Sequence, residues 1–142
     1  MIKSAIRLMD EKPSVDEFRM LREQSGLSGK TEAAAIAGLA GGLFAVTLRD
    51  DDKAIGMGRI IGDGGCHYQV VDIAVLPAYQ GQGWGKAIMA RLKAWIDENV
   101  PESGYVSLIA DGEAKQLYAQ YEFTETAPAS VGMAFHKRMK LP

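Results

Sequence analysis

The chain has 142 residues, of which 47% are hydrophobic and 24% charged, a composition typical of one soluble globular domain. Its 16 Lys and Arg against 18 Asp and Glu give a net charge of −2, so there is no basic excess to neutralise phosphates of nucleic acid. No apolar run is long enough to span a membrane, the N-terminus lacks the apolar stretch of a signal peptide, and the single Cys66 cannot form an internal disulfide. We therefore expect one cytoplasmic domain over residues 1–142 that binds neither nucleic acid nor a membrane.

The N-terminal half alternates between strand and helix signals. Ser14 followed by Glu17 predicts a capping box and therefore a helix. An alanine-rich stretch over residues 30–39 predicts a second helix, which Gly41 and Gly42 end. From their β-branched and aromatic residues, the strands expected in this half are Lys3–Leu8, Leu43–Leu48, Ala54–Ile61 and Tyr68–Val75, with a hairpin turn at Gly62–Gly65.

The C-terminal half begins with a glycine cluster that leads directly into an amphipathic helix. Apolar residues at helical spacing run from Ile88 to Ile96, and Pro101 brackets the end of this helix. Further along we expect a strand at Tyr105–Ala110, a short helix at Ala114–Tyr121, and two closing strands at Phe123–Thr126 and Met133–Met139. This order predicts a mixed α/β or α+β fold in which helices pack on one sheet.

The glycine cluster from Gln80 to Lys86 is the most informative feature of the sequence. Glycines between a buried strand and a helix let backbone amides approach a ligand and adopt positive φ without a steric penalty. The first turn of a helix adds unpaired N–H groups and the positive end of the helix dipole. This combination is suited to a phosphate or pyrophosphate.

Three anion-binding motifs compete for this stretch. A dinucleotide fingerprint requires G-x-G-x-x-G after the first strand, whereas here the glycines are Gly81, Gly83 and Gly85 and two helices precede them. A nucleotide P-loop requires a longer spacing and a hydroxyl, and Ala87 offers none. The pattern Q/R-x-x-G-x-G/A is matched in full. The alternative interpretation is a glycine-rich turn that binds no ligand.

The stretch from Val71 to Met89 resembles the acetyl-coenzyme A (acetyl-CoA) motif of the GCN5-related N-acetyltransferases (GNAT), and Ala110 to Phe123 resembles a later motif of that family. Two positions depart from the family pattern, because Glu122 stands where a Gly is usual and no Asn follows Ala110. The resemblance implies a GNAT-type α/β (α+β) fold, with a central mixed, mostly antiparallel sheet that splays to hold the cofactor and is flanked by helices.

The resemblance also implies the cofactor and the residues that contact it. Acetyl-CoA is expected as co-substrate, without a metal. The residues expected to bind it are Gln80, Gly81, Gln82, Gly83, Trp84, Gly85 and Lys86, with backbone amides of Ile73, Ala74 and Val75 freed by a strand bulge as donors to the oxyanion. Trp84 can equally pack the start of the helix. A homodimer is compatible with the family, although no sequence feature points to one.

Acetyl transfer requires a neutral amine and a leaving thiolate. The resemblance implies Tyr118 as general acid toward the thiolate, and simple core packing is the alternative for that residue. Asp72 is the leading candidate for a base, because a carboxylate in so apolar a strand is unusual. Its alternative role is that of a structural partner for a backbone amide or a cation. The family position that often carries the base is occupied here by Val71, which cannot serve, while His67 and Asp111 are weaker candidates.

Strand alternation predicts that Val71, Ile73 and Val75 share one face of their strand, and that Val70, Asp72 and Ala74 share the other. The candidate base Asp72 is therefore expected on the face opposite Val71 and Ile73.

Three functions are consistent with these features. The first is transfer of an acetyl group from acetyl-CoA to the primary amine of a small molecule by direct attack on the thioester. The second is acetylation of a protein or peptide amine. The third is a non-catalytic acyl-CoA-binding sensor. Nothing in the sequence identifies the acceptor.

Overall fold

The computed structural model describes residues 5–139. The chain divides into two compact units, one ending at Leu108 and the other beginning at Ile109. The elements of the first unit are β1 (Ile6–Met9), α1 (Val15–Gln24), α2 (Glu32–Gly41), β2 (Phe44–Asp50), β3 (Lys53–Gly62), β4 (His67–Val75), a 3-10 turn (Pro77–Tyr79), α3 (Trp84–Asn99) and β5 (Tyr105–Ser107). The second unit contains a 3-10 turn (Gly112–Ala114) followed by α4 (Lys115–Ala119).

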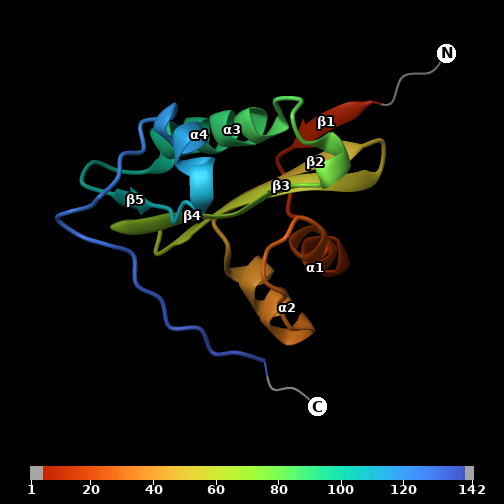
Figure 1. Ribbon diagram of the computed structural model, residues 1–142, viewed down its shortest axis with the longest axis horizontal. Coiled ribbons are helices and arrows are strands. Elements are labelled where there is room, and N and C mark those ends of the chain that lie inside the picture. Colours follow the sequence, from red (N-terminus) through yellow and green to blue (C-terminus); the bar gives the residue numbers. More distant parts are fainter. Residues whose placement is uncertain (1–4, 140–142) are drawn as a thin grey trace. The chain divides into compact units, whose positions relative to one another are not determined.

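The first unit is built on one five-stranded sheet in the order β1-β2-β3-β4-β5. Every neighbouring pair is antiparallel except β4 and β5, which are parallel, so the sheet is mixed and mostly antiparallel, as expected. Figure 1 shows α3 on one face of this sheet and α1 with α2 on the other. This arrangement confirms the predicted fold class.

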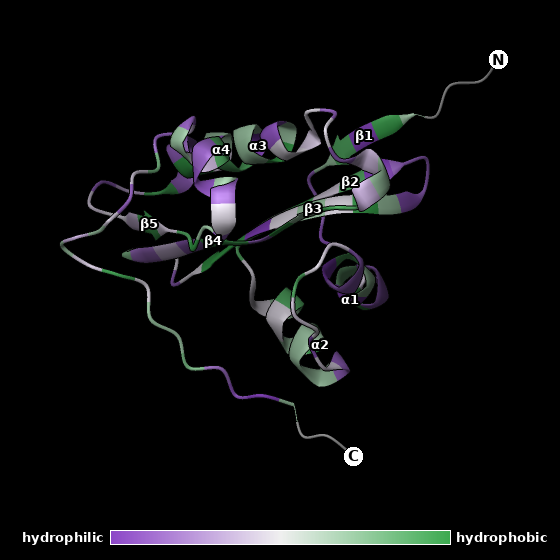
Figure 2. Cartoon of the chain, viewed as in Figure 1, coloured by the Kyte–Doolittle hydropathy of each residue, from purple (hydrophilic) through white to green (hydrophobic). Residues whose placement is uncertain are grey.

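Both faces of the sheet are closed by apolar side chains. On the α1 and α2 face, Phe18 and Leu21 of α1 join Leu39 of α2 and the inward residues of the strands in one buried cluster. On the other face, α3 buries three side chains, Ile88, Met89 and Leu92. Figure 2 shows that α1 is mostly hydrophilic in colour whereas α2 is pale to green, because α2 has no charged residue after Glu32.

Local signals in the sequence predicted several elements correctly. The capping box of α1 is present, because the Ser14 hydroxyl accepts from the Glu17 amide and the Glu17 carboxylate accepts from the Ser14 amide. The second predicted helix starts slightly later and includes Gly41, with Gly42 as its C-cap. The first strand is Ile6–Met9, and the predicted start at Lys3 lies outside the described residues.

The prediction of two closing strands at Phe123–Thr126 and Met133–Met139 is wrong. Residues 123–139 contain no strand, and Phe135 is 93% exposed. An alternating apolar pattern becomes a strand only when a neighbouring strand supplies the hydrogen-bond ladder and a buried face, and this segment has neither in the described part of the chain. For the same reason the strand predicted at Tyr105–Ala110 ends at Ser107.

Within residues 5–139, no helix is sufficiently long and apolar to cross a lipid bilayer.

Candidate active site

The central feature of the site is a β-bulge in β4. Met57 pairs with Ala74 and Arg59 pairs with Val71, so Gly58 alone opposes the two residues Asp72 and Ile73. Asp72 adopts a left-handed conformation with φ of 58°. A bulge of this kind places one residue in the left-handed region and interrupts the ladder of hydrogen bonds beside it. The bulge expected from the family resemblance is therefore present.

Gly58 is what allows α3 to approach the strand opposite the bulge. A Cβ at this position would lie 2.7 Å from Cγ2 of Ile88 and 3.0 Å from Cδ1 of Leu92. It would also lie 3.6 Å from Cγ1 of Ile73, which shows that Ile73 points toward α3. The absence of a side chain at residue 58 thus seats α3 directly on the irregular part of β4.

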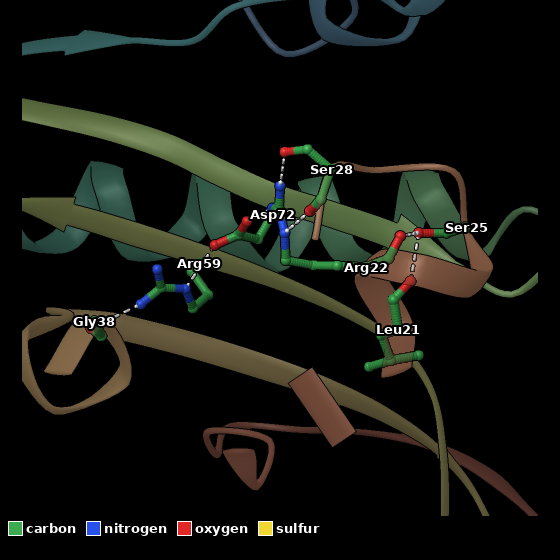
Figure 3. Close-up of polar contacts among 7 residues, drawn as sticks. All are labelled: Leu21, Arg22, Ser25, Ser28, Gly38, Arg59 and Asp72. Atoms are coloured by element: carbon green, nitrogen blue, oxygen red, sulfur yellow. Dashed lines mark hydrogen bonds and ion pairs between the residues drawn. The ribbon is translucent and has the colours of Figure 1, made fainter. Parts of the chain in front are cut away.

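Asp72 is held by two arginines from different elements (Figure 3). Its Oδ2 accepts from Nε of Arg59 at 2.9 Å, and its Oδ1 is ion-paired with Nη1 of Arg22. The side chains are nearly buried, with Asp72 8% exposed and each arginine 9% exposed. Both carboxylate oxygens are therefore engaged by cations, which over-determines the left-handed backbone of Asp72.

The two arginines extend this contact to the helices. Nε of Arg22 donates to the Ser28 carbonyl at 2.8 Å and its Nη2 donates to the Ser28 hydroxyl at 3.1 Å. Nη1 of Arg59 donates to the carbonyl of Gly38 in α2 at 3.1 Å. The ring of Phe18 lies 5.9 Å from the Arg22 guanidinium and 5.3 Å from that of Arg59. We call Arg22, Asp72 and Arg59 the ion triad.

The bulge changes which residues of β4 share a face. Asp72 contacts Arg22 of α1, and Ala74 belongs to the cluster on the α1 side, as alternation predicted. Val71, however, pairs with Arg59, whose guanidinium reaches α2. Side chains of directly paired residues in antiparallel strands lie on the same face of the sheet, so Val71 lies on the same face as Asp72. The prediction that Val71 shares a face with Ile73 is therefore wrong. The extra residue of the bulge shifts the alternation by one position.

The contacts of Asp72 match the second interpretation of that residue, a structural partner for a cation, and the structure supplies two cations. Neither arginine was paired with Asp72 on sequence grounds. A signal was nevertheless available, because Arg22 follows Phe18 and Leu21 on the core-facing stripe of α1, and Arg59 interrupts an apolar strand. A buried arginine requires a partner, and Asp72 is the carboxylate that lies in an equally apolar segment.

Before the chain reaches the bulge, β4 separates from its neighbour β5. The two strands pair only through His67–Gln69 and Tyr105–Ser107. From Val70 to Val75, β4 has no strand partner on that side among residues 5–139. The predicted oxyanion donors, the amides of Ile73, Ala74 and Val75, thus lie in the part of β4 that combines a bulge with an open edge.

The glycine cluster from Gln80 to Lys86, which we now call the glycine loop, follows this open edge after the 3-10 turn. Gly81 and Gly83 have φ of 77° and 88°, and a Cβ on either would meet no atom within 4 Å. Gly83 is the N-cap of α3 and no side chain caps the helix. In the described part of the chain, the backbone N–H groups from Gly81 to Gly85 have no acceptor. An open, uncapped helix start with this many free amides fits the pyrophosphate of a coenzyme.

Two side chains of the loop are directed toward the protein. Nε2 of Gln80 donates to the carbonyl of Val75 at 2.8 Å and so ties the loop to the end of β4. Trp84 packs against the buried cluster on the α1 side, which matches the alternative of helix packing, and its enclosed indole N–H has no acceptor among residues 5–139. The amides of the loop, rather than these side chains, face the open side.

Tyr118 lies in α4, in the second compact unit. Burial, and to a smaller extent the Asp111 carboxylate, raises the pKa of its phenol above the ordinary value. The phenol is therefore protonated at neutral pH, which is the form that a general acid requires. In the same unit Glu122 has φ of 70°, so it adopts the left-handed conformation that the usual glycine would take. The turn is retained in spite of the substitution.

The described residues contain no cluster of three or more His, Cys, Asp or Glu side chains arranged to hold a metal ion. His67 is exposed at the start of β4, and Asp111 precedes the 3-10 turn of the second unit.

Comparison with known proteins assigns the chain to a family. Residues 41–125 match the family described as acetyltransferase (GNAT) domain. The chain belongs to the GNAT family. The matched segment includes the bulge, the glycine loop and Tyr118, so the features described above lie within the family domain.

Three relatives illustrate the range of this similarity. A probable acetyltransferase of unknown function from meticillin-resistant Staphylococcus aureus is 46% identical with a TM-score of 0.88, over 93% of this chain and 99% of that one. The GCN5-related N-acetyltransferase 2, chloroplastic, of Arabidopsis thaliana is 31% identical over 91 residues. That match covers 63% of this chain but only 34% of the plant protein, so the chain spans about a third of this curated relative. An aminoglycoside N-acetyltransferase solved with CoA is 18% identical, with a TM-score of 0.66 over 97% of this chain and 98% of its own, and shows the fold alone.

Proposed function

We propose that this protein is an acetyl-CoA-dependent N-acetyltransferase that acts on the primary amine of a small molecule. The observation that carries the proposal is the direct succession of a bulged, open strand edge and an uncapped glycine loop along β4 and the start of α3. In the proposed reaction the amine nitrogen forms a bond to the acetyl carbon and the bond from that carbon to sulfur breaks. The nitrogen loses a proton and the thiolate gains one.

In this proposal the glycine loop holds the coenzyme. The amides of Gly81 to Gly85 bind the pyrophosphate, Gln80 fixes the loop to Val75, and Gln82, Trp84 and Lys86 complete the contact surface. When bound, acetyl-CoA supplies the activated acetyl group. The amides of Ile73 and Val75 donate to the acetyl oxygen as negative charge develops there, whereas that of Ala74 points toward β3, as does that of Leu76, which donates to the Ile55 carbonyl. Preorganised donors of this type each contribute about 3–4 kcal/mol to lowering the barrier.

Proton transfer is assigned to the two candidates that the sequence indicated. Tyr118, kept protonated by its raised pKa, donates to the departing thiolate. The assignment of Asp72 as the base stays a prediction, and its contacts favour a positioning role, because both carboxylate oxygens are already engaged by arginines. In that role Asp72 holds the bulge and thereby aims the amides that follow it.

Two other aspects remain part of the proposal. A cytoplasmic location agrees with the exposed free thiol of Cys66, which suits a reducing compartment. A homodimer agrees with the family resemblance, and no described contact bears on it.

A thiol-release assay on a panel of small amines and peptides tests the proposed function. We expect CoA release with small primary amines, and a ten- to a hundredfold lower turnover in Tyr118→Phe, about the usual contribution of general acid catalysis or below it. Release with peptides alone would indicate a protein acetyltransferase. Tight binding of acetyl-CoA without release on any acceptor would indicate a sensor. Unchanged turnover in Tyr118→Phe would rule out the acid role of that residue.

A further inference from the structure

The ion triad has an uneven balance of charge. Two guanidinium groups face one carboxylate, so a nearly buried cluster has a net charge of +1. Among residues 5–139 no second Asp or Glu forms an ion pair with Arg22 or Arg59. Buried charges in proteins are normally paired, because removing an ion from water is costly. One further negative charge would therefore neutralise the triad.

Arg59 also has hydrogen-bond donors to spare. A guanidinium has five N–H donors. Nε of Arg59 donates to Asp72 and Nη1 donates to Gly38, whereas Nη2 has no acceptor in the described part of the chain. The side-chain atoms that are both enclosed and without a partner there are Oδ1 of Asp50 and Nε1 of Trp84 only. Nη2 of Arg59 is not among them, so it keeps some solvent-accessible area although the side chain is nearly buried.

Arg59 contacts the glycine-containing end of α2 through the Gly38 carbonyl (Figure 3). A Cβ at Gly42 would lie 3.1 Å from Nη1 of Arg59, so a larger residue there would press on the guanidinium. A Cβ at Gly38 or Gly41 would meet no atom within 4 Å. Gly38 is the residue whose carbonyl orients Arg59. Neither Gly38 nor Gly41 therefore places a side chain against the guanidinium.

Arg59 is also close to the place where the reaction is proposed to occur. It pairs across the sheet with Val71, immediately before the bulge. At a rise of about 3.3 Å per residue, the amides of Ile73 and Val75 lie roughly 7 to 13 Å from that position along β4. A small molecule that contacts Nη2 of Arg59 can therefore present an amine near those amides.

We propose that Arg59, supported by Arg22, binds an oxyanion of the acceptor, so that the acceptor is a primary amine that also bears a carboxylate or a phosphate. This inference rests on the proposed function and specifies its substrate class. The oxyanion supplies the missing negative charge of the triad and accepts from Nη2 of Arg59. Acceptors that are only cationic lack this contact and meet a site of like charge.

Matched pairs of amines test the inference on the unaltered protein. The carboxylate arm compares amino acids with their amides, and the phosphate arm compares phosphoethanolamine with ethanolamine and glucosamine 6-phosphate with glucosamine. Binding to CoA-saturated protein is measured by calorimetry at fixed ionic strength, and turnover is measured by thiol release. In at least one arm we expect the oxyanion member to bind about ten- to a hundredfold more tightly than the partner that lacks the oxyanion, as for a hydrogen bond between charged groups.

A variant then assigns the preference to the triad. Arg59→Gln is expected to abolish the preference, and Arg59→Lys to keep part of it. The matched control is Arg91→Gln, which removes an arginine that pairs with Asp10 on the exposed side of α3 and should leave the preference unchanged. Circular dichroism checks that each variant folds. If Arg59→Gln does not fold, the Lys variant and the matched pairs carry the test.

The outcomes separate the inference from the proposed function. Acetyl transfer without any preference for the oxyanion members overturns the inference and leaves the function standing. Preferential binding of those members without transfer overturns the function and leaves the anion site standing. A preference that survives Arg59→Gln places the anion elsewhere and overturns the inference, and absence of both binding and transfer overturns both.

Discussion

Two residues that lie eleven positions apart, Asp72 and Gly83, adopt the same left-handed backbone conformation by opposite means. Gly83 has no side chain, no neighbour within 4 Å of a Cβ, and an exposed position at the start of α3. Asp72 has a side chain that two arginines hold in a nearly buried cluster. A non-glycine residue in this region costs about 1–2 kcal/mol, so the contacts of the Asp72 carboxylate must offset that cost.

The difference between the two positions follows from what each one contacts, which is the proposed coenzyme at Gly83 and the two arginines at Asp72. At Gly83 the backbone itself faces the proposed ligand, so any side chain is an obstruction. At Asp72 the two arginines hold the residue through its side chain. The backbone that follows lies at a strand edge that β5 does not cover. Substitution should therefore change binding at Gly83 and the stability of the fold at Asp72.

The largest effect is expected from removal of the Asp72 carboxylate. Asp72→Ala leaves two buried guanidinium groups without their shared partner and keeps a Cβ in the left-handed region. Removing one member of a buried ion pair costs about 3–5 kcal/mol, and we expect a loss of this size in the free energy of unfolding, measured by chemical denaturation.

Asp72→Gly is the matched control, because it removes the same carboxylate and, having no Cβ, adopts the left-handed conformation without strain. It should be about 1–2 kcal/mol more stable than Asp72→Ala. Equal stability of the two variants would mean that residue 72 leaves the left-handed conformation once its carboxylate no longer contacts the arginines. A stability close to that of the wild type in both would show that the triad contributes little, and Asp72 would then not differ from Gly83 in the way proposed.

The next effect concerns binding rather than stability. Gly83→Asp introduces a negative charge and a side chain where the pyrophosphate is proposed to lie, and we expect at least about a hundredfold weaker binding of CoA, measured by calorimetry. Gly64→Asp is the matched control, because Gly64 has φ of 82° and open surroundings in the turn between β3 and β4. Both variants should lose similar stability, and only Gly83→Asp should lose binding. Equal affinity in the two would remove the coenzyme from the glycine loop.

The contrast between local and distant contacts also explains what could be predicted from the sequence. The capping box at Ser14 and the glycine loop at Gly81 to Gly85 are encoded by residues within a few positions of each other, so local patterns identified them correctly. The ion triad joins Arg22 to Asp72, residues 50 positions apart, and that pairing depends on how α1 packs on the sheet. Apolar patterning alone cannot specify such a contact.

The bulge sets a second limit on prediction. The alternation rule assumes one residue per step on both strands, and the extra residue at Asp72 moves Val71 to the face opposite the one expected. The closing strands failed for a related reason, because Met133 and Phe135 alternate as a strand would but have no partner among the described residues. In both cases the missing information is the pairing of strands, which is non-local.

The smallest effect is expected at Glu122, another left-handed position, with φ of 70°. It resembles Asp72 in having a side chain, but it is exposed, whereas Asp72 is nearly buried. Glu122→Gly should relieve the backbone strain and raise the free energy of unfolding by up to about 1 kcal/mol, less whatever the Glu122 side chain itself contributes. Thermal denaturation of Glu122→Gly and Glu122→Ala provides the measurement, since both variants lack the carboxylate and only one retains a Cβ. If the Ala variant is as stable as the Gly variant, the strain at this position is negligible, and the cost assigned to the left-handed backbone of Asp72 would have to be reduced accordingly.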